Sequence, residues 1–327
     1  MVKRYVQDIR REFKGYNGST LKNDLLAGLT VTAVALPLAL AFGIGSGATA
    51  QSGLITAIIA GSIIAIFAGA SSQISGPTGA MMAILILMVQ DYGINSIFVA
   101  GVMSGIVLIL CGVLRLGKVV TFIPAPVVIG FTSGIALVIA IGQIDNFLGA
   151  KTPGAESTAL KFVGYFTHPF TPNPYAIGVA LAVMLIMILW PKKWQAILPS
   201  SLVALIVVSA VSILANFPVD TIGEIPKSLL PKDRLDIFGI DFSLIKKMLV
   251  PCLSIAALNM METLMCGEIG AKEKHEKYDP NRDLVSQGIG NIILPFFGGV
   301  PATAAIARSS VGIKSGGKTR LVSIFHA

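Results

Sequence analysis

The sequence predicts an all-α polytopic membrane protein built as an inverted repeat, in which the third and tenth spans are half-helices. Its mean hydropathy is +0.79 and charged residues make up only 13 % of the chain, which is typical of polytopic membrane proteins and excludes an ordinary soluble domain. No charged residue occurs between Leu25 and Gln90. At about 20 residues per crossing, this run alone accommodates roughly three spans.

Apolar runs, charges and prolines divide the chain into ten spans. The basic and aromatic segment 1–23 is expected to form an amphipathic helix on the cytoplasmic surface. The first seven spans are predicted at about 25–44, 49–70, 77–90, 95–114, 119–148, 175–190 and 195–215. The last three are predicted at about 248–267, 284–297 and 301–313. Polar loops separate them, the longest at 149–173 and 216–247.

Two short segments carry the main structural signal. They are Ser75-Gly76-Pro77-Thr78-Gly79-Ala80 and Gly298-Gly299-Val300-Pro301-Ala302-Thr303-Ala304, each with glycines and a proline ahead of an apolar run. Because proline is favoured at the first helical position, each is interpreted as an extended strand that becomes a half-helix inside the membrane. Helix N-termini present free N–H groups and a positive dipole, so two facing ends would form an anion site. The alternative is a Pro/Gly kink in two ordinary helices.

A repeat and the charge distribution predict the topology. Pro37 and Pro77 belong to the first and third spans of one set, and Pro251 and Pro301 belong to the first and third spans of a second, similar set. Seven spans precede residue 243, and a unit with an odd number of spans is inverted when it is repeated. With the amino end inside, cytoplasmic segments hold 17 Lys and Arg against seven outside, in keeping with the positive-inside rule. By this symmetry the second repeat is expected to be incomplete.

The same segments resemble the SulP family of anion transporters. The resemblance rests on Leu36–Gly43, Ile74–Gly79, Asn281–Asn291, Phe297–Arg308 and Ser315–Thr319. It implies a seven-plus-seven inverted-repeat fold of the uracil-permease type, with a mobile core domain, a gate domain and usually a cytoplasmic STAS domain. It further implies a homodimer at full length. No enzyme activity and no cofactor are expected.

Together with the spans, the resemblance predicts five regions. Residues 1–23 are the cytoplasmic amino-terminal segment. Residues 24–148 would hold spans one to five, of which one to four belong to the core and the fifth starts the gate. Residues 149–242 would hold gate spans six and seven with extracellular loops. Residues 243–314 would return to the core with spans eight to ten, and 315–327 would begin a truncated eleventh span.

Two charged residues lie away from the ends of the predicted spans. Glu262 is the acid of this pair, and such a residue is a functional candidate by default; the resemblance assigns the matching acid to the coupling ion. Arg308 lies seven residues after Pro301, about two turns down the half-helix. Its guanidinium suits tetrahedral oxyanions, and the resemblance implies an arginine at the anion site. The alternatives are a structural ion pair and a snorkelling arginine.

The predicted site surrounds these two groups. The anion-binding set is Phe42, Ser75, Thr78, Gly79, Ala80, Ala302, Thr303, Ala304 and Arg308, with main-chain N–H groups that include Ala305, and no metal. Glu262 is the proton-coupling acid: when ionised it is expected to pair with Arg308, and protonation would free the arginine for the anion. Cys266 stands where a sodium-coupled relative carries threonine, and a thiol is a poor ligand for a hard cation. Proton coupling is therefore favoured over sodium.

The sequence thus predicts a multi-pass inner or plasma membrane transporter of a small inorganic oxyanion, with sulfate favoured, proton symport and an elevator-type movement. Bicarbonate or a dicarboxylate is the alternative cargo. A nucleobase permease is a further alternative that Arg308 argues against, and a non-transporting fragment that needs further helices is another. Gly312–Thr319 matches the phosphate-loop pattern, but no soluble α/β strand precedes it. The net charge of +8 is attributed to cytoplasmic loops rather than to nucleic-acid binding.

Overall fold

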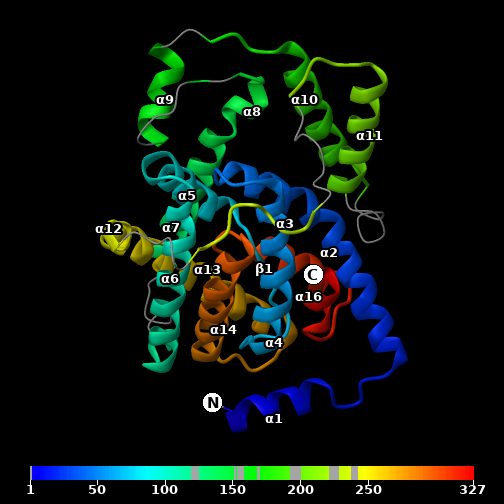
Figure 1. The fold of residues 1–327 in the computed structure, drawn as a ribbon. Helices are drawn as coiled ribbons and strands as arrows, with labels where there is room; N and C mark the ends of the chain where they lie inside the picture. Colours follow the sequence, from blue (N-terminus) through cyan, green and yellow to red (C-terminus); the bar gives the residue numbers. More distant parts are fainter. Residues whose placement is uncertain are drawn as a thin grey trace. The chain divides into compact units, whose positions relative to one another are not determined.

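The computed structural model describes residues 2–118, 125–150, 152, 158–167, 170–191, 200–220, 228–236 and 242–327. The chain divides into two compact units, and Figure 1 colours its elements by residue number. Unit 1 comprises residues 1–123 and 225–327, and unit 2 comprises residues 124–224. Nearly all the regular elements in both units are helices.

Unit 1 contains two runs of elements. The first is α1 (Val2–Glu12), α2 (Gly18–Gly45), α3 (Ala50–Ile59), a π-helical turn (Ala60–Ile64), α4 (Ala65–Phe67), β1 (Ser75–Gly76), α5 (Gly79–Tyr92) and α6 (Asn95–Val113). The second is α12 (Phe242–Lys247), α13 (Leu249–Lys274), α14 (Pro280–Ile293), a 3-10 turn (Leu294–Phe297), β2 (Thr303–Ala304), α15 (Ile306–Lys314) and α16 (Leu321–His326). Unit 2 contains α7 (Ala125–Gly142), α8 (Ile144–Leu148), α9 (Thr158–Thr167), α10 (Pro174–Leu189) and α11 (Ser200–Leu214).

Within the described ranges, four helices are long and apolar enough to cross a membrane: α2, the continuous helix from Ala50 to Phe67, α6 and α13. Three more are apolar but shorter: α5, α10 and Val203–Leu214 in α11. These seven match predicted spans one to four and six to eight. The predicted starts of spans five and seven, at 119 and 195, lie outside the described residues, as does the basic pair Lys192-Lys193.

Several helix ends differ from the prediction. The first span begins at Gly18 rather than Leu25, because Asn17 accepts a hydrogen bond from the Thr20 N–H at 3.0 Å and caps the helix there. The predicted surface segment 1–23 therefore includes the start of α2. The eighth-span helix continues to Lys274, well past its apolar part. The loops predicted at 149–173 and 216–247 contain the helices α9 and α12.

Helix α14 packs closely along α6 through glycines. Gly105 and Gly288 face each other, and a Cβ atom on either would collide with the carbonyl oxygen of the other. Small residues let membrane helices approach in this way. Because one side of α14 lies against α6, its buried polar side chains Gln287 and Asn291 are left to contact the segments that carry the candidate site.

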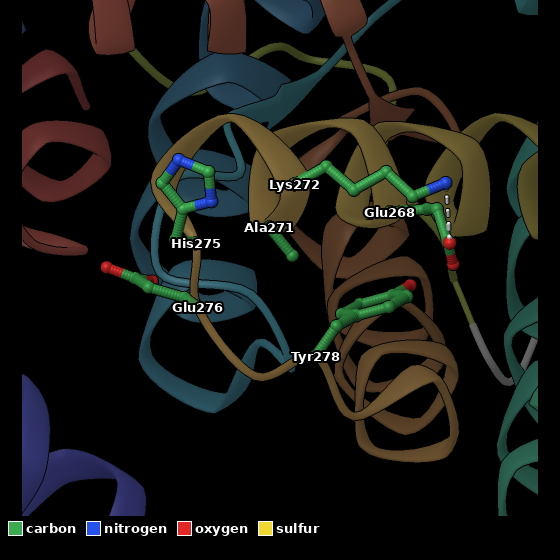
Figure 2. A pocket seen from close by; sticks show the side chains of 6 residues that line it. All are labelled: Glu268, Ala271, Lys272, His275, Glu276 and Tyr278. Carbon is green, nitrogen blue, oxygen red and sulfur yellow. Dashed lines mark ion pairs between the residues drawn. The ribbon is translucent and has the colours of Figure 1, made fainter.

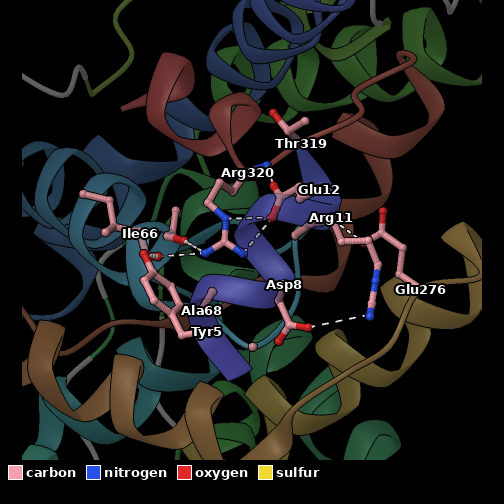
Figure 3. Close-up of polar contacts among 12 residues, drawn as sticks. Tyr5, Asp8, Arg11, Glu12, Ile66, Ala68, Glu276, Thr319 and Arg320 are labelled. Atoms are coloured by element: carbon pink, nitrogen blue, oxygen red, sulfur yellow. Dashed lines mark hydrogen bonds and ion pairs between the residues drawn. The ribbon is translucent and has the colours of Figure 1, made fainter. Parts of the chain in front are cut away.

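Helix α1 is attached to the rest of unit 1 by two arginine–carboxylate pairs, and Figure 3 shows the one between Arg320 and Glu12. Arg320 donates to Glu12 Oε2 through Nη2 at 2.8 Å and Nε at 2.9 Å, and the two side chains are only 6 % and 8 % exposed. Arg282 donates to Asp8 at 2.6 Å. The Tyr5 ring lies 5.6 and 6.0 Å from the two guanidinium carbons. The acidic face of α1 is therefore turned toward the protein.

Replacing Arg320 by methionine is expected to destabilise unit 1 strongly. The change leaves the buried Glu12 carboxylate unpaired and removes the donor to the carbonyls of Ala65 and Ile66, and breaking one side of a buried pair costs about 3–5 kcal/mol. Thermal unfolding of the detergent-purified chain measures the effect. The control is Arg11→Met on α1, whose side chain is 63 % exposed and should matter little; equal losses in the two variants would contradict this account.

Candidate anion site

The two predicted segments meet as a short ribbon. β1 pairs with β2 in an antiparallel register that sets Ser75 opposite Ala304 and Gly76 opposite Thr303. Helix α5 follows β1 and begins at Gly79, after the predicted Pro77. Helix α15 begins at Ile306, not at Pro301 as predicted, because residues 303–304 are extended and paired with β1. The correction shortens the tenth-span half-helix but keeps its amino end beside β1.

Arg308 lies in the first turn of α15, so the prediction that it sits two turns down the half-helix is wrong. The side chain is 4 % exposed, and Nη2 donates to the carbonyl oxygen of Pro77 at 2.6 Å. Its Nη1 is buried and finds no partner among the described residues. The guanidinium also lies where a Cβ atom on Gly76 would be. A buried charged donor without an acceptor is costly, and Nη1 can therefore donate to an anion placed beside it.

Glu262 reaches the same turn of the chain from α13. Its Oε2 accepts a hydrogen bond from Thr78 Oγ1 at 3.2 Å, next to the Pro77 carbonyl that Arg308 contacts. In the described part of the chain no ion pair joins Glu262 to Arg308, so the expected direct contact is absent here. Both side chains instead meet the residues that lead into α5. The snorkelling alternative for Arg308 does not fit its burial.

The amino end of α5 supplies further donors. Thr78 caps the helix by accepting from the Met81 N–H at 3.4 Å. The N–H groups of Gly79 and Ala80, the first two of the helix, have no acceptor within it. The helix dipole adds partial positive charge at this end. Together with Arg308 Nη1, this turn can hold an anion without any other fixed charge.

Thr303 lies on the α13 side of the ribbon, where its hydroxyl is 3.3 Å from Thr263 Oγ1. Three other predicted contacts have different partners. The Ser75 hydroxyl accepts from Gln287 at 2.8 Å, the Ala302 N–H donates to Asn291 at 2.8 Å, and the Ala305 N–H donates to Ile74 at 3.0 Å. The main-chain N–H groups of Ala302 and Ala305 are thus used within the protein. Phe42 is half-buried in α2, and Ala304 is buried opposite Ser75.

Buried polar side chains that the sequence analysis did not single out hold these segments in place. They are Thr56, Gln73, Asn259, Thr263, Gln287, Asn291 and Ser309. The signal for them was present, because polar residues inside apolar helices are rare and usually paired. Asn291 closes one of the motifs that carries the family resemblance, and Asn259 lies one turn before Glu262.

A cavity of about 460 Å³ lies at the carboxyl end of α13 and is drawn in Figure 2. It is lined by Glu268, Ala271, Lys272, His275, Glu276 and Tyr278, and Lys272 pairs with Glu268 at 3.1 Å. Burial, followed by the charge of Asp283, raises the pKa of Tyr278 well above its ordinary value, and its hydroxyl donates to Asp283 at 3.0 Å. None of the predicted site residues lines this cavity. In the described ranges no group of three or more His, Cys, Asp or Glu could hold a metal ion.

Replacing Gly76 by alanine is expected to impair anion binding. The added methyl group would overlap the Arg308 guanidinium, which would have to leave the Pro77 carbonyl and the amino end of α5. Loss of one hydrogen bond to a charged group corresponds to about 1.5–3 kcal/mol, or roughly a 10- to 100-fold weaker affinity. Titration with radiolabelled sulfate would measure it. Gly134→Ala on α7, where a Cβ meets nothing within 4 Å, is the control, and equal affinities in the two variants would contradict the placement of Arg308.

Comparison with known proteins places this chain in a family. The model of the sulfate permease family matches residues 21–327. YvdB of Bacillus subtilis (strain 168), provisionally named a sulfate transporter, is 38 % identical over 96 % of this chain and 60 % of its own length. The bicarbonate transporter BicA of Synechocystis is 34 % identical over 94 % of this chain and 55 % of its own length. The chain therefore spans a little over half the length of these relatives.

Solved structures agree. The transmembrane domain of a cyanobacterial bicarbonate transporter BicA superposes with a TM-score of 0.82 at 33 % identity, over 96 % of this chain and 80 % of that domain. The anion transporter Slc26a9 in its inward-facing state superposes with a TM-score of 0.81 at 18 % identity, over 94 % of this chain and 55 % of that one. The predicted all-α membrane fold of the inverted-repeat type is confirmed by these likenesses.

Proposed function

Because the chain belongs to the sulfate permease family of membrane anion transporters, we propose that it carries sulfate across the membrane together with a proton. The unpaired Nη1 of buried Arg308, beside the amino end of α5, carries this proposal. A tetrahedral oxyanion would accept hydrogen bonds from Nη1 and from the N–H groups of Gly79 and Ala80, with Thr78 and Thr303 nearby. Such an anion would neutralise a guanidinium that is buried in the protein interior.

Glu262 binds and releases the coupled proton in this proposal. Its carboxylate bonds Thr78 at 3.2 Å, one residue from the Arg308 contact at Pro77. When ionised, the carboxylate attracts Arg308 and repels an incoming anion; when protonated, it does neither. Protonation therefore favours anion binding, and the two are carried together. Cys266 donates to Ser309 at 3.3 Å, and its thiol makes the turn after Glu262 a poor sodium site.

The division into two units supports an elevator-type movement. The proposed anion site lies wholly within unit 1, which we assign to the core, and we assign unit 2 to the gate. In this movement the core would carry its site as one rigid body, while the gate stays fixed. We further propose an inner or plasma membrane location with the amino terminus in the cytoplasm, and a homodimer for the full-length protein.

Bicarbonate is the second candidate cargo. The similarity to BicA in sequence and structure favours it. Arg308 favours sulfate, because its buried positive charge attracts a doubly charged oxyanion more strongly than a singly charged one.

Uptake by proteoliposomes tests the proposal. The purified 327-residue chain is reconstituted, and radiolabelled sulfate and bicarbonate are compared under an inward proton gradient and under an inward sodium gradient. We expect sulfate uptake that rises with the proton gradient and is insensitive to sodium. Sodium-driven bicarbonate uptake without sulfate uptake would support the second candidate instead, and uptake of neither anion would favour the non-transporting fragment that needs further helices.

A further inference from the structure

The ribbon of β1 and β2 is too short to fix its own register. Each strand contributes two residues, so few main-chain bonds oppose a shift of one strand along the other. Isolated two-stranded pairs are marginally stable even when they are longer. Something outside the ribbon must therefore hold the two segments in the observed pairing.

Asn259 of α13 donates to the Ala302 carbonyl and Ser309 of α15 accepts from the Ile74 N–H, but helix α14 contacts both segments, with two side chains one turn apart. Asn291 bonds the main chain of Ala302 in both directions: Oδ1 accepts from the Ala302 N–H at 2.8 Å, and Nδ2 donates to the Ala302 carbonyl at 2.9 Å. Gln287 donates to Ser75 Oγ at 2.8 Å. Both side chains are fully buried. One helix thus contacts β1 at Ser75 and the residue directly before β2, and Asn291 bonds Ala302 as a neighbouring strand would.

The register decides which side chains face the anion. Directly opposite residues of an antiparallel pair share a face, and successive residues alternate. Gly76 and Thr303 therefore lie on one face, where Arg308 covers Gly76 and Thr263 contacts Thr303. A shift of one residue would exchange the two faces. An alanine would then replace Thr303, and Gly76 would no longer leave room for the guanidinium.

We propose that Asn291 is a positioning residue that sets the register of the ribbon through Ala302, with Gln287 holding the opposite strand through Ser75. The inference rests on the proposed function, since it names the residues that assemble that same anion site. Asn291 touches no anion in this account; it acts through Thr303, Gly76 and Arg308. A buried asparagine that specifies register has a physical precedent in helical assemblies.

The test compares Asn291→Leu with Ser286→Ala. Ser286 is also buried on α14, but among the residues that the structure describes its hydroxyl bonds only the Asp283 carbonyl of its own helix, at 2.8 Å. We expect Asn291→Leu to raise the KM for sulfate uptake at least tenfold, whereas Ser286→Ala stays within about twofold of the parent, as expected for a change away from the site. A folded Asn291→Leu chain with an unchanged KM would overturn the proposal.

Asn291→Asp keeps the proposal testable if the leucine variant fails to fold. A protonated carboxyl offers one O–H donor and one carbonyl acceptor and can replace the amide, whereas a carboxylate cannot donate to Ala302. Uptake relative to the parent chain at the same pH should therefore recover as the assay pH falls. A ratio that does not change with pH would contradict a role through Ala302.

A readout without transport separates this inference from the proposed function. In the chain carrying Ser75→Cys and Ala304→Cys, the opposed positions should form a disulfide under mild oxidation, identified by mass spectrometry. Adding Asn291→Leu should lower its yield at least tenfold, and adding Ser286→Ala should not. Equal yields would overturn the register claim even if sulfate uptake is normal, and a lowered yield would sustain it even if the cargo is not sulfate.

Discussion

Replacing Arg308 by methionine is expected to lower the affinity for sulfate by at least 10- to 100-fold. The variant loses the one buried guanidinium atom that has no partner in the described structure, together with the charge that faces the amino end of α5. A hydrogen bond to a charged group is worth about 1.5–3 kcal/mol, and about 1.4 kcal/mol corresponds to tenfold in affinity. The KM for radiolabelled sulfate in proteoliposomes gives the value.

Two further variants sharpen this prediction. Arg308→Lys keeps the charge but loses the planar fork of donors, so it should fall between the parent and the methionine variant. Lys314→Met removes a positive charge from the exposed end of the same helix and should leave the KM nearly unchanged. If Lys314→Met weakened sulfate binding as much as Arg308→Met, the effect would be one of general charge, and the site described here would be wrong.

Replacing Glu262 by glutamine is expected to uncouple sulfate uptake from the proton gradient. The amide keeps the size of the side chain and can still accept from Thr78, but it neither ionises nor releases a proton. Uptake should therefore continue down the sulfate gradient, while the stimulation by an inward proton gradient is lost. The measured quantity is the ratio of initial uptake rates with and without the proton gradient.

Glu268→Gln provides the matched control for Glu262. Glu268 lies on the same helix, its side chain is 46 % exposed, and it pairs with Lys272 at the surface. Its replacement should leave the stimulation by protons intact. A Glu262→Gln transporter that kept the full stimulation would remove this residue from the coupling mechanism.

Much of the fold follows from local properties of the sequence. The charge-free run from Leu25 to Gln90 and the glycine–proline segments around Pro77 and Pro301 predicted the spans and the meeting of two broken segments. These predictions succeed because membrane insertion depends on the apolar length of each segment. Glycine and proline also affect the backbone conformation at their own positions, whatever the rest of the fold. Helix α5, which begins directly after Pro77-Thr78, shows this plainly.

The finer arrangement of the site depends on contacts between distant segments, which the sequence alone does not reveal. Residues 303–304 pair with 75–76 rather than start a helix, and this pairing moves Arg308 into the first turn of α15. Likewise, the charge pattern of residues 1–23 predicted a helix on the membrane surface. Only the buried partners Arg282 and Arg320, far along the chain, turn the acidic face of α1 toward the protein.

The central claim is that one anion is held between Arg308 and the amino end of α5. A structure of the detergent-purified chain with selenate, located by the anomalous scattering of selenium, tests it most directly. The account predicts one selenium peak within hydrogen-bonding reach of Arg308 Nη1 and the N–H groups of Gly79 and Ala80, and no such peak in Arg308→Met. A selenium peak elsewhere in the chain, with this position empty at saturating selenate, would contradict it.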